Sequence, residues 1–124
     1  MHPPDVRPPS KNPLIGIVGP CGAGKTTLAD GLRAAGFNAH PIAQEHSFVP
    51  EMWRLISNPA LLIFLDASYE VCTQRKRLDW RREEYEEELR RLRHARRECD
   101  HYLNSDALDA GQVLQQILTH IISP

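Results

Sequence analysis

The residues best suited to chemistry lie in the stretch GPCGAGKTT, residues 19–27, which we call the glycine-rich loop. It contains every fixed position of the pattern G-x-x-x-x-G-K-[ST], namely Gly19, Gly24, Lys25 and Thr26. In such a loop the glycines let successive backbone N–H groups turn toward a phosphate, where a Cβ would clash. The lysine supplies positive charge for the outer phosphates, and the next hydroxyl can reach a Mg2+ shared between them. The pattern therefore predicts nucleotide binding.

Within the glycine-rich loop we expect eight residues to contact the nucleotide: Gly19, Cys21, Gly22, Ala23, Gly24, Lys25, Thr26 and Thr27. Lys25 is also a candidate catalytic residue because its charge faces the transferred phosphate, and Thr26 is a candidate Mg2+ ligand. Cys21 occupies a freely variable position of the pattern. A helix start beside it could lower the pKa of its thiol, but we favour a bystander role.

A loop of this kind needs a strand before it and a helix after it, and the flanking residues predict both. The short apolar run 14–18 is typical of a strand buried on both faces of a parallel sheet. Residues 25–35 have apolar side chains at helical spacing and end before Gly36. The run 61–66 predicts a second central strand, and 37–42, which Pro41 interrupts, predicts an edge strand.

The remaining segments predict further helices and one more strand. Helices are expected at 51–57, at 68–77 with Ser68 as its cap, at 81–97 as a mostly exposed helix docked along one edge, and at 110–122. The last strand is expected at 100–104. Together these elements predict an α/β fold of P-loop NTPase type, a three-layer α/β/α sandwich with a small, mainly parallel sheet of about four strands.

Composition limits the setting in which this fold works. The chain has 124 residues and a formal charge of -1, and no apolar run approaches the ~20 residues of a membrane helix. The three cysteines have no paired spacing, and no signal-peptide pattern is present, so we expect reduced thiols and a cytoplasmic setting. Residues 1–13 hold five of the ten prolines and predict a flexible arm before a domain at 14–124.

From residue 14 to 122 the chain resembles the small P-loop kinases, which include thymidylate, deoxynucleoside, shikimate and adenylylsulfate kinases. Apart from the glycine-rich loop, LLIFLDASYEVCTQRKRLDW (61–80) looks like their strand, helix start and arginine-rich lid. DHYLNSDALDAGQVLQQILTHI (100–121) looks like their last strand and terminal helix. The resemblance implies ATP and Mg2+ as ligands and transfer of the γ-phosphate to a small-molecule acceptor, such as a nucleoside or nucleotide.

The resemblance also implies roles for cations in the lid. Arg75 and Arg77 are the first candidates to close over the transferring phosphoryl group, and Arg81 and Arg82 are the second. Guanidinium groups stabilise the charge that develops on phosphoryl oxygens in the transition state. The alternative for any one of them is a solvated cation at the basic end of a helix.

Two acidic residues are candidates for roles near the phosphates. Asp66 ends the central strand, where it could help to hold Mg2+ or could serve only as a turn or cap residue. Glu45 lies where deoxynucleoside-kinase relatives have a carboxylate near the acceptor hydroxyl, which it could orient or deprotonate. Its neighbour His46 could bind substrate or be a surface residue.

The chain departs from these kinases in the acceptor region, where only residues 43–60 fill the gap before the central strand. This short segment could admit a small acceptor, could be completed by a second subunit in a homodimer, or could leave a nucleotide binder without phosphotransfer. Phe48, Met52 and Trp53 could line the acceptor pocket or belong to the core.

The second hypothesis for function is a nucleotide-dependent switch or interaction module that contacts a protein partner through residues 81–97. Nucleic-acid binding by the arginines of this segment is disfavoured, because five glutamates interleave with them.

Overall fold

The computed structural model describes residues 13–76 and 79–122. The strands in this part of the chain are β1 (Leu14–Val18), β2 (Asn38–Pro41), β3 (Leu61–Asp66) and β4 (His101–Asn104). The α-helices are α1 (Lys25–Ala34), α2 (Tyr69–Lys76), α3 (Arg82–Arg91), α4 (Arg93–Glu98) and α5 (Ala110–Ile122). The 3₁₀ helix η2 (Gln44–His46) and the π-helix η3 (Trp53–Ser57) lie between β2 and β3. The predicted arm, apart from Pro13, and the candidate Arg77 lie outside the described residues.

The four strands form one parallel sheet in the order β2-β1-β3-β4. The central strands are therefore the two strongly apolar runs, and the strand that contains Pro41 lies at an edge, as predicted. An edge suits this strand because proline has no N–H to donate to a second neighbour. The α/β class and the parallel sheet are confirmed.

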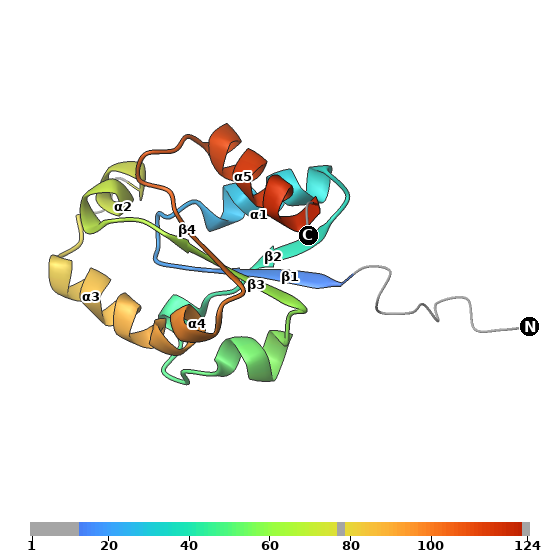
Figure 1. Cartoon of the computed structure of the whole chain (residues 1–124). Helices are drawn as coiled ribbons and strands as arrows, with labels where there is room; N and C mark the ends of the chain where they lie inside the picture. The colour runs from blue at the N-terminus through green and yellow to red at the C-terminus, as the bar shows by residue number, and fades with distance from the viewer. Residues whose placement is uncertain (1–12, 77–78, 123–124) are drawn as a thin grey trace, which may run out of the picture.

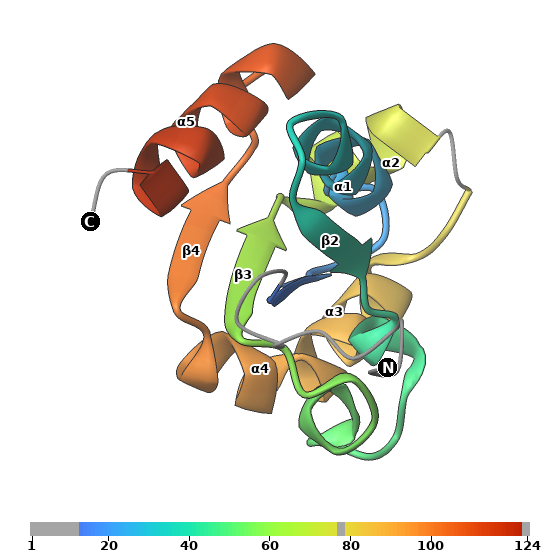
Figure 2. The ribbon, with the colours of Figure 1, turned by 90° about the vertical axis from the view of Figure 1, so that its right-hand side faces the viewer.

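Helices cover both faces of the sheet, as in an α/β sandwich (Figures 1 and 2). Alternate residues of β3 point to opposite faces, so each face has its own apolar core. On one face, Ile63 and Leu65 share a core with residues of α1 and α5, among them Leu32 and Ile117. On the other face, Leu62 and Phe64 pack with residues from η3 and from the chain around α4. β3 is therefore buried from both sides, which explains its continuous apolar run.

The prediction of one continuous helix over residues 81–97 is wrong. The helix is interrupted at Leu92, which separates α3 from α4. The Leu92 side chain is fully buried against the second face of the sheet, beside Ala95 of α4. Its N–H is shared between the carbonyl oxygens of Glu88 at 3.0 Å and Leu89 at 3.2 Å, the tightened pattern common at a helix end. The two helices thus cover a face of the sheet instead of lying along an edge.

The predicted helix at 51–57 is shorter in the structure, where it is the single π-helical stretch η3. It ends at Asn58, whose φ of 44° is left-handed, one residue before Pro59. Across the described ranges of the chain, no helix has both the length and the apolar character needed to pass through a bilayer.

The packing of β4 on α5 predicts a pH-dependent stability. The ring of His101 stacks on that of His120 with centroids 3.8 Å apart, and burial followed by the neighbouring imidazole lowers the pKa of His101. The folded chain then binds this proton less readily than the unfolded chain does, so stability falls as the pH drops below the ordinary value of 6.5.

The Tm of the unmodified chain should fall between about pH 7 and pH 5.5. We expect this fall to be smaller by about 1–3 °C in His101→Gln. Thermal melts followed by circular dichroism measure this change. The control is His40→Gln on the exposed edge strand, and an equal reduction in both variants would contradict the assignment to His101.

Candidate functional site

The glycine-rich loop leaves the carboxyl end of β1 and runs directly into α1. Gly24 is the N-cap residue of α1, with a left-handed φ of 104° that favours glycine. Gly19 is required for a different reason, because a Cβ at this position would lie 1.9 Å from the carbonyl oxygen of Leu65 in β3. The glycines thus let the backbone turn closely over the end of the neighbouring strand before the helix begins.

A cavity of about 660 Å3 opens in front of this loop. Its lining includes the whole stretch from Cys21 to Thr27, and Glu45 and Arg75 join it from distant parts of the chain. Gly19, the first residue of the loop, is buried and is not part of the lining. The cavity thus brings together most of the candidate site residues within the described part of the chain. Its other walls are formed by residues of α1, β3 and α2, residues from the end of β2 to η2, and residues before and at the start of α5: Leu28, Pro41, Ile42, Ala43, His46, Leu65, Lys76, Leu108, Asp109, Ala110 and Val113.

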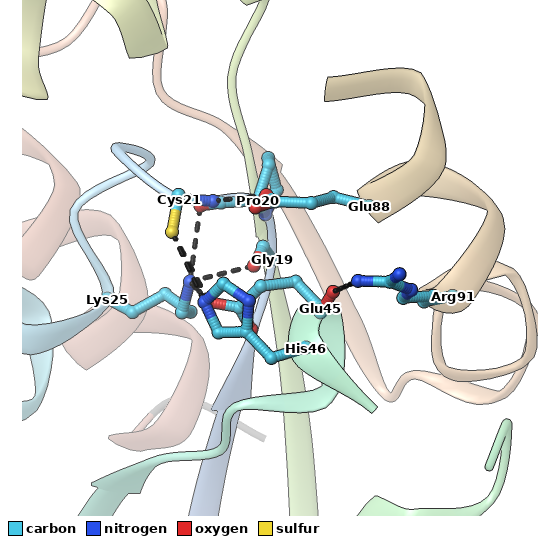
Figure 3. A network of polar contacts seen from close by, with 8 residues as sticks. All are labelled: Gly19, Pro20, Cys21, Lys25, Glu45, His46, Glu88 and Arg91. Atoms are coloured by element: carbon cyan, nitrogen blue, oxygen red, sulfur yellow. Dashed lines mark hydrogen bonds and ion pairs between the residues drawn. The ribbon is translucent and has the colours of Figure 1, made fainter. Parts of the chain in front are cut away.

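Lys25 and Glu45, which both line the cavity, form a buried ion pair (Figure 3). The Lys25 Nζ lies 2.8 Å from the Glu45 Oε2, and the two side chains are only 9% and 5% exposed. The same Nζ donates to the carbonyl oxygens of Gly19 at 2.7 Å and Pro20 at 3.2 Å. The second carboxylate oxygen, Oε1, is buried and accepts no hydrogen bond from the described residues. This oxygen therefore has no partner within the described structure.

Glu88 is a buried carboxylate beside the loop that sequence reasoning missed. It belongs to α3, which packs against η2, and its Oε1 accepts the N–H of Cys21 at 2.9 Å. Burial, and to a smaller extent the charge of Glu45, raise the pKa of Glu88. The signal was present in the spacing: Glu88 lies three residues after Tyr85 and four before Leu92, on the one apolar face of its helix.

The Cys21 thiol lies between two other functional groups at the mouth of the cavity. Its Sγ is 3.5 Å from the Nε2 of His46 and 3.9 Å from the Oε2 of Glu45. Burial, followed by the negative charges of Glu88 and Glu45, raises the pKa of this thiol. The idea that the helix start could lower this pKa is therefore wrong, because desolvation and two carboxylates outweigh it.

Arg75 lines the cavity and also ties three segments together. One of its terminal nitrogens, Nη1, donates to the Ala23 carbonyl oxygen at 3.1 Å and to the Ser105 Oγ at 2.8 Å. The other, Nη2, donates to the carbonyl oxygens of Ser105 at 2.7 Å and Leu108 at 3.4 Å. This guanidinium connects the glycine-rich loop to the segment between β4 and α5.

These contacts indicate a structural role for Arg75, which a stability measurement can distinguish from a role in the lid. We expect Arg75→Lys to lower the free energy of unfolding by about 1–3 kcal/mol, because an ammonium cannot make the forked set of bonds. Urea unfolding measures the change, and Arg82→Lys, whose partner Glu70 is exposed, should cost less than about 0.5 kcal/mol. An unchanged stability in Arg75→Lys would contradict the structural role.

The other lid candidates differ in position. Arg81 pairs with Glu84 and Arg82 pairs with Glu70, and neither arginine lines the cavity. Lys76, which sequence reasoning did not single out, does line it. Its Cγ would lie 3.0 Å from a Cβ built on Gly22, so its stem runs close against the glycine-rich loop.

The two candidate Mg2+ ligands have different surroundings. Thr26 is exposed in the first turn of α1 and lines the cavity. Both carboxylate oxygens of Asp66 are engaged: Oδ1 accepts the N–H of Ala67 at 2.9 Å, and Oδ2 accepts the hydroxyl of Tyr102 at 2.6 Å. Asp66 thus connects β3 to β4 in this state, and metal binding by either residue stays a prediction.

The short segment 43–60 contributes to the core more than to the cavity. Gln44 is fully buried, where its Oε1 accepts the N–H of Trp53 at 2.9 Å. Trp53 packs in the core of the second face, whereas Phe48 is 82% exposed beneath the Arg91 guanidinium. Of the described residues that line the cavity, none is Phe48, Met52 or Trp53, so the pocket interpretation of these three is wrong for this cavity.

No protein-family model matches the sequence, and a comparison with curated proteins finds no match. The functional interpretation therefore depends on the glycine-rich loop and on the groups that converge around it.

Proposed function

We propose that this chain is a small ATP-dependent kinase of P-loop NTPase type. In this proposal Mg-ATP binds with its phosphates on the glycine-rich loop, and the γ-phosphate passes to a hydroxyl of a small acceptor such as a nucleoside or nucleotide. The supporting observation is that one cavity joins the start of α1, the Lys25 ammonium and the buried Glu45 carboxylate.

The cavity suits the phosphates of a nucleotide in its charge and its size. The first N–H groups of a helix and the helix dipole favour an anion, and Lys25, Arg75 and Lys76 supply three cations around the cavity. A volume of about 660 Å3 lies within the ~300–1,000 Å3 range of small-molecule sites. Apolar side chains near the start of α5, including Leu108 and Val113, offer a surface for the base.

The proposed chemistry begins with an exchange of ion-pair partners. Bound phosphates attract Lys25 away from Glu45 and compete with Glu88 for the Cys21 N–H. Glu45, whose Oε2 loses its partner when Lys25 moves, then accepts the proton of the acceptor hydroxyl. As the new oxygen–phosphorus bond forms, the bond between the γ-phosphorus and the bridging oxygen breaks, and ADP leaves.

Magnesium would supply further neutralisation of the phosphate charge. The Thr26 hydroxyl suits it because it is exposed on the first turn beside the loop. Asp66 could take part only by giving up its bonds to Tyr102 or Ala67.

Transfer of label from γ-labelled ATP tests the kinase proposal. The full chain would be incubated with a panel of nucleosides, nucleotides and small alcohols, and Lys25→Met would serve as the inactive control. We expect labelled product with one acceptor class and none with the control. Binding of Mg-ATP without transfer to any acceptor would count against a kinase and favour the alternative.

That alternative is a nucleotide-dependent switch that binds a protein partner, including a second copy of the chain. It is supported by four exposed apolar side chains, which follow the cavity-lining residues Glu45 and His46 in the sequence: Phe48, Val49, Leu55 and Ile56. It predicts that sedimentation of the chain, alone or with a partner, differs between ADP and ATP. Identical association with both nucleotides would contradict it.

A further inference from the structure

Four side chains with metal-binding atoms converge beside the glycine-rich loop, and the kinase proposal leaves most of them unused. Cys21, His46 and Glu88 each offer one ligand atom, and these atoms all lie within 4.8 Å of one another. Glu45 adds a fourth group, because its Oε2 lies 3.9 Å from the Cys21 Sγ and 3.7 Å from the His46 Nε2. The four residues come from the glycine-rich loop, η2 and α3 (Figure 3).

The distances among these atoms match one face of a tetrahedral metal site. In a zinc site with Zn–S of about 2.3 Å and Zn–N and Zn–O of about 2.0 Å, neighbouring ligand atoms are roughly 3.3–3.6 Å apart. The Cys21 Sγ and the His46 Nε2 are 3.5 Å apart. The Oε2 of Glu45 lies 3.9 Å from the Sγ and 3.7 Å from the Nε2, which exceeds this range by at most a few tenths of an ångström. These three atoms therefore come close to one face of the site, and Glu88, whose ligand atom lies within 4.8 Å of the Sγ and Nε2 atoms, would have to approach further to supply the fourth ligand.

An unsatisfied atom gives independent support for a missing ligand. The side chain of Glu45 is only 5% exposed. Its Oε1 is buried and has no hydrogen-bond partner among the described residues. Buried carboxylate oxygens are rarely left without a partner. The structure thus leaves one oxygen of Glu45 without a partner, while the other oxygen, Oε2, lies near the thiol and the imidazole.

Charge and access also favour a divalent cation. Once a bound metal displaces the thiol proton, the thiolate and the two carboxylates would carry three negative charges, which Lys25 and one divalent ion together would balance. Lys25 keeps the carbonyl oxygens of Gly19 and Pro20 as acceptors when a metal shares Glu45. The side chain of His46 is more than half exposed, and His46 and Glu88 also line a second cavity of about 490 Å3 along α3, so an ion has a path to the cluster.

We propose that Cys21, His46, Glu45 and Glu88 form a binding site for a thiophilic divalent transition metal of the Zn2+ class. Thiolate and imidazole ligands select such ions over Mg2+, which prefers oxygen. The site is therefore distinct from the magnesium of the proposed kinase reaction and does not depend on that reaction.

Titration of the full, chelator-stripped and reduced chain with Co2+ alone tests this site. We expect a thiolate-to-cobalt charge-transfer band that saturates at a single Co2+ per chain, disappears on addition of Zn2+ and persists in excess Mg2+. Absence of the band, or its loss to Mg2+, would overturn the proposal.

Matched variants assign the band to this cluster. Cys21→Ser should remove it, and Cys99→Ser, which changes the other half-buried thiol, should keep it. His46→Gln changes an exposed side chain and should weaken Co2+ binding by at least about tenfold without altering the thermal melt. A band that survives Cys21→Ser, or unchanged Co2+ affinity in His46→Gln, would refute the site even if one variant folds poorly.

The outcome is separable from that of the kinase proposal. Co2+ binding without Mg-ATP binding would leave the metal site intact and reject the kinase. Mg-ATP binding without the charge-transfer band would do the reverse.

Discussion

Replacing Lys25 with methionine is expected to abolish nucleotide binding and to destabilise the fold. The ammonium is the cation closest to Glu45, and without it a buried carboxylate loses its partner at 2.8 Å. Breaking a buried pair in this way costs about 3 kcal/mol. For nucleotide binding, loss of the charged contact should weaken Mg-ATP affinity by about 100-fold or more. Urea unfolding and isothermal titration measure the two effects separately.

The double variant Lys25→Met/Glu45→Gln separates the structural role of Lys25 from its binding role. Neutralising Glu45 removes the unpaired charge, so we expect stability to return to within about 1 kcal/mol of the unmodified chain. Mg-ATP binding should stay lost, because no ammonium faces the phosphates. Lys25→Met with unchanged stability, or a double variant that binds Mg-ATP normally, would contradict this account.

Replacing Gly19 with alanine is expected to have the largest effect on folding. The new Cβ would lie 1.9 Å from the Leu65 carbonyl oxygen, and β1 and β3 are paired immediately beside this point through Val18 and Phe64. Neither strand can move aside without losing core packing. We expect a cost of about 3 kcal/mol or more, a fall in Tm of roughly 10 °C and loss of nucleotide binding.

Gly36→Ala is the matched control for this substitution. Gly19 has a positive φ of 153° and Gly36 one of 97°, but a Cβ at Gly36 meets no atom within 4 Å. Its cost should be only the backbone strain of about 1 kcal/mol, with nucleotide binding retained. Equal losses in the two variants would show that positive φ, and not the close approach to β3, explains the requirement at Gly19.

The strands and their places in the sheet could be predicted because a parallel sheet buries its strands on both faces. The uninterrupted apolar runs 14–18 and 61–66 became the central strands, and Pro41 marked an edge. The break at Leu92 could not be predicted, since no glycine or proline marks it. It arises from tertiary packing, which brings Leu92 and Ala95 into the same core.

The candidate site was predictable where side-chain type alone determines the chemistry. Lys25 and Thr26 were expected from the loop pattern and Glu45 from the resemblance to deoxynucleoside kinases, and all three line one cavity. Residue type alone does not distinguish Glu88 from the neighbouring glutamates, most of which are exposed. Only its spacing from Tyr85 places it on the apolar face of the helix. The role of Arg75 depends on backbone acceptors in segments distant in sequence, which no local pattern reveals.

The central claim is that the cavity at the glycine-rich loop recognises the phosphates of a nucleotide. Isothermal titration of the full chain with Mg-ATP, and in parallel with adenosine, tests it most directly. The account predicts that Mg-ATP binds at a single site per chain and that adenosine binds at least about 100-fold more weakly. Equal affinity for the two ligands, or no binding of Mg-ATP, would contradict it.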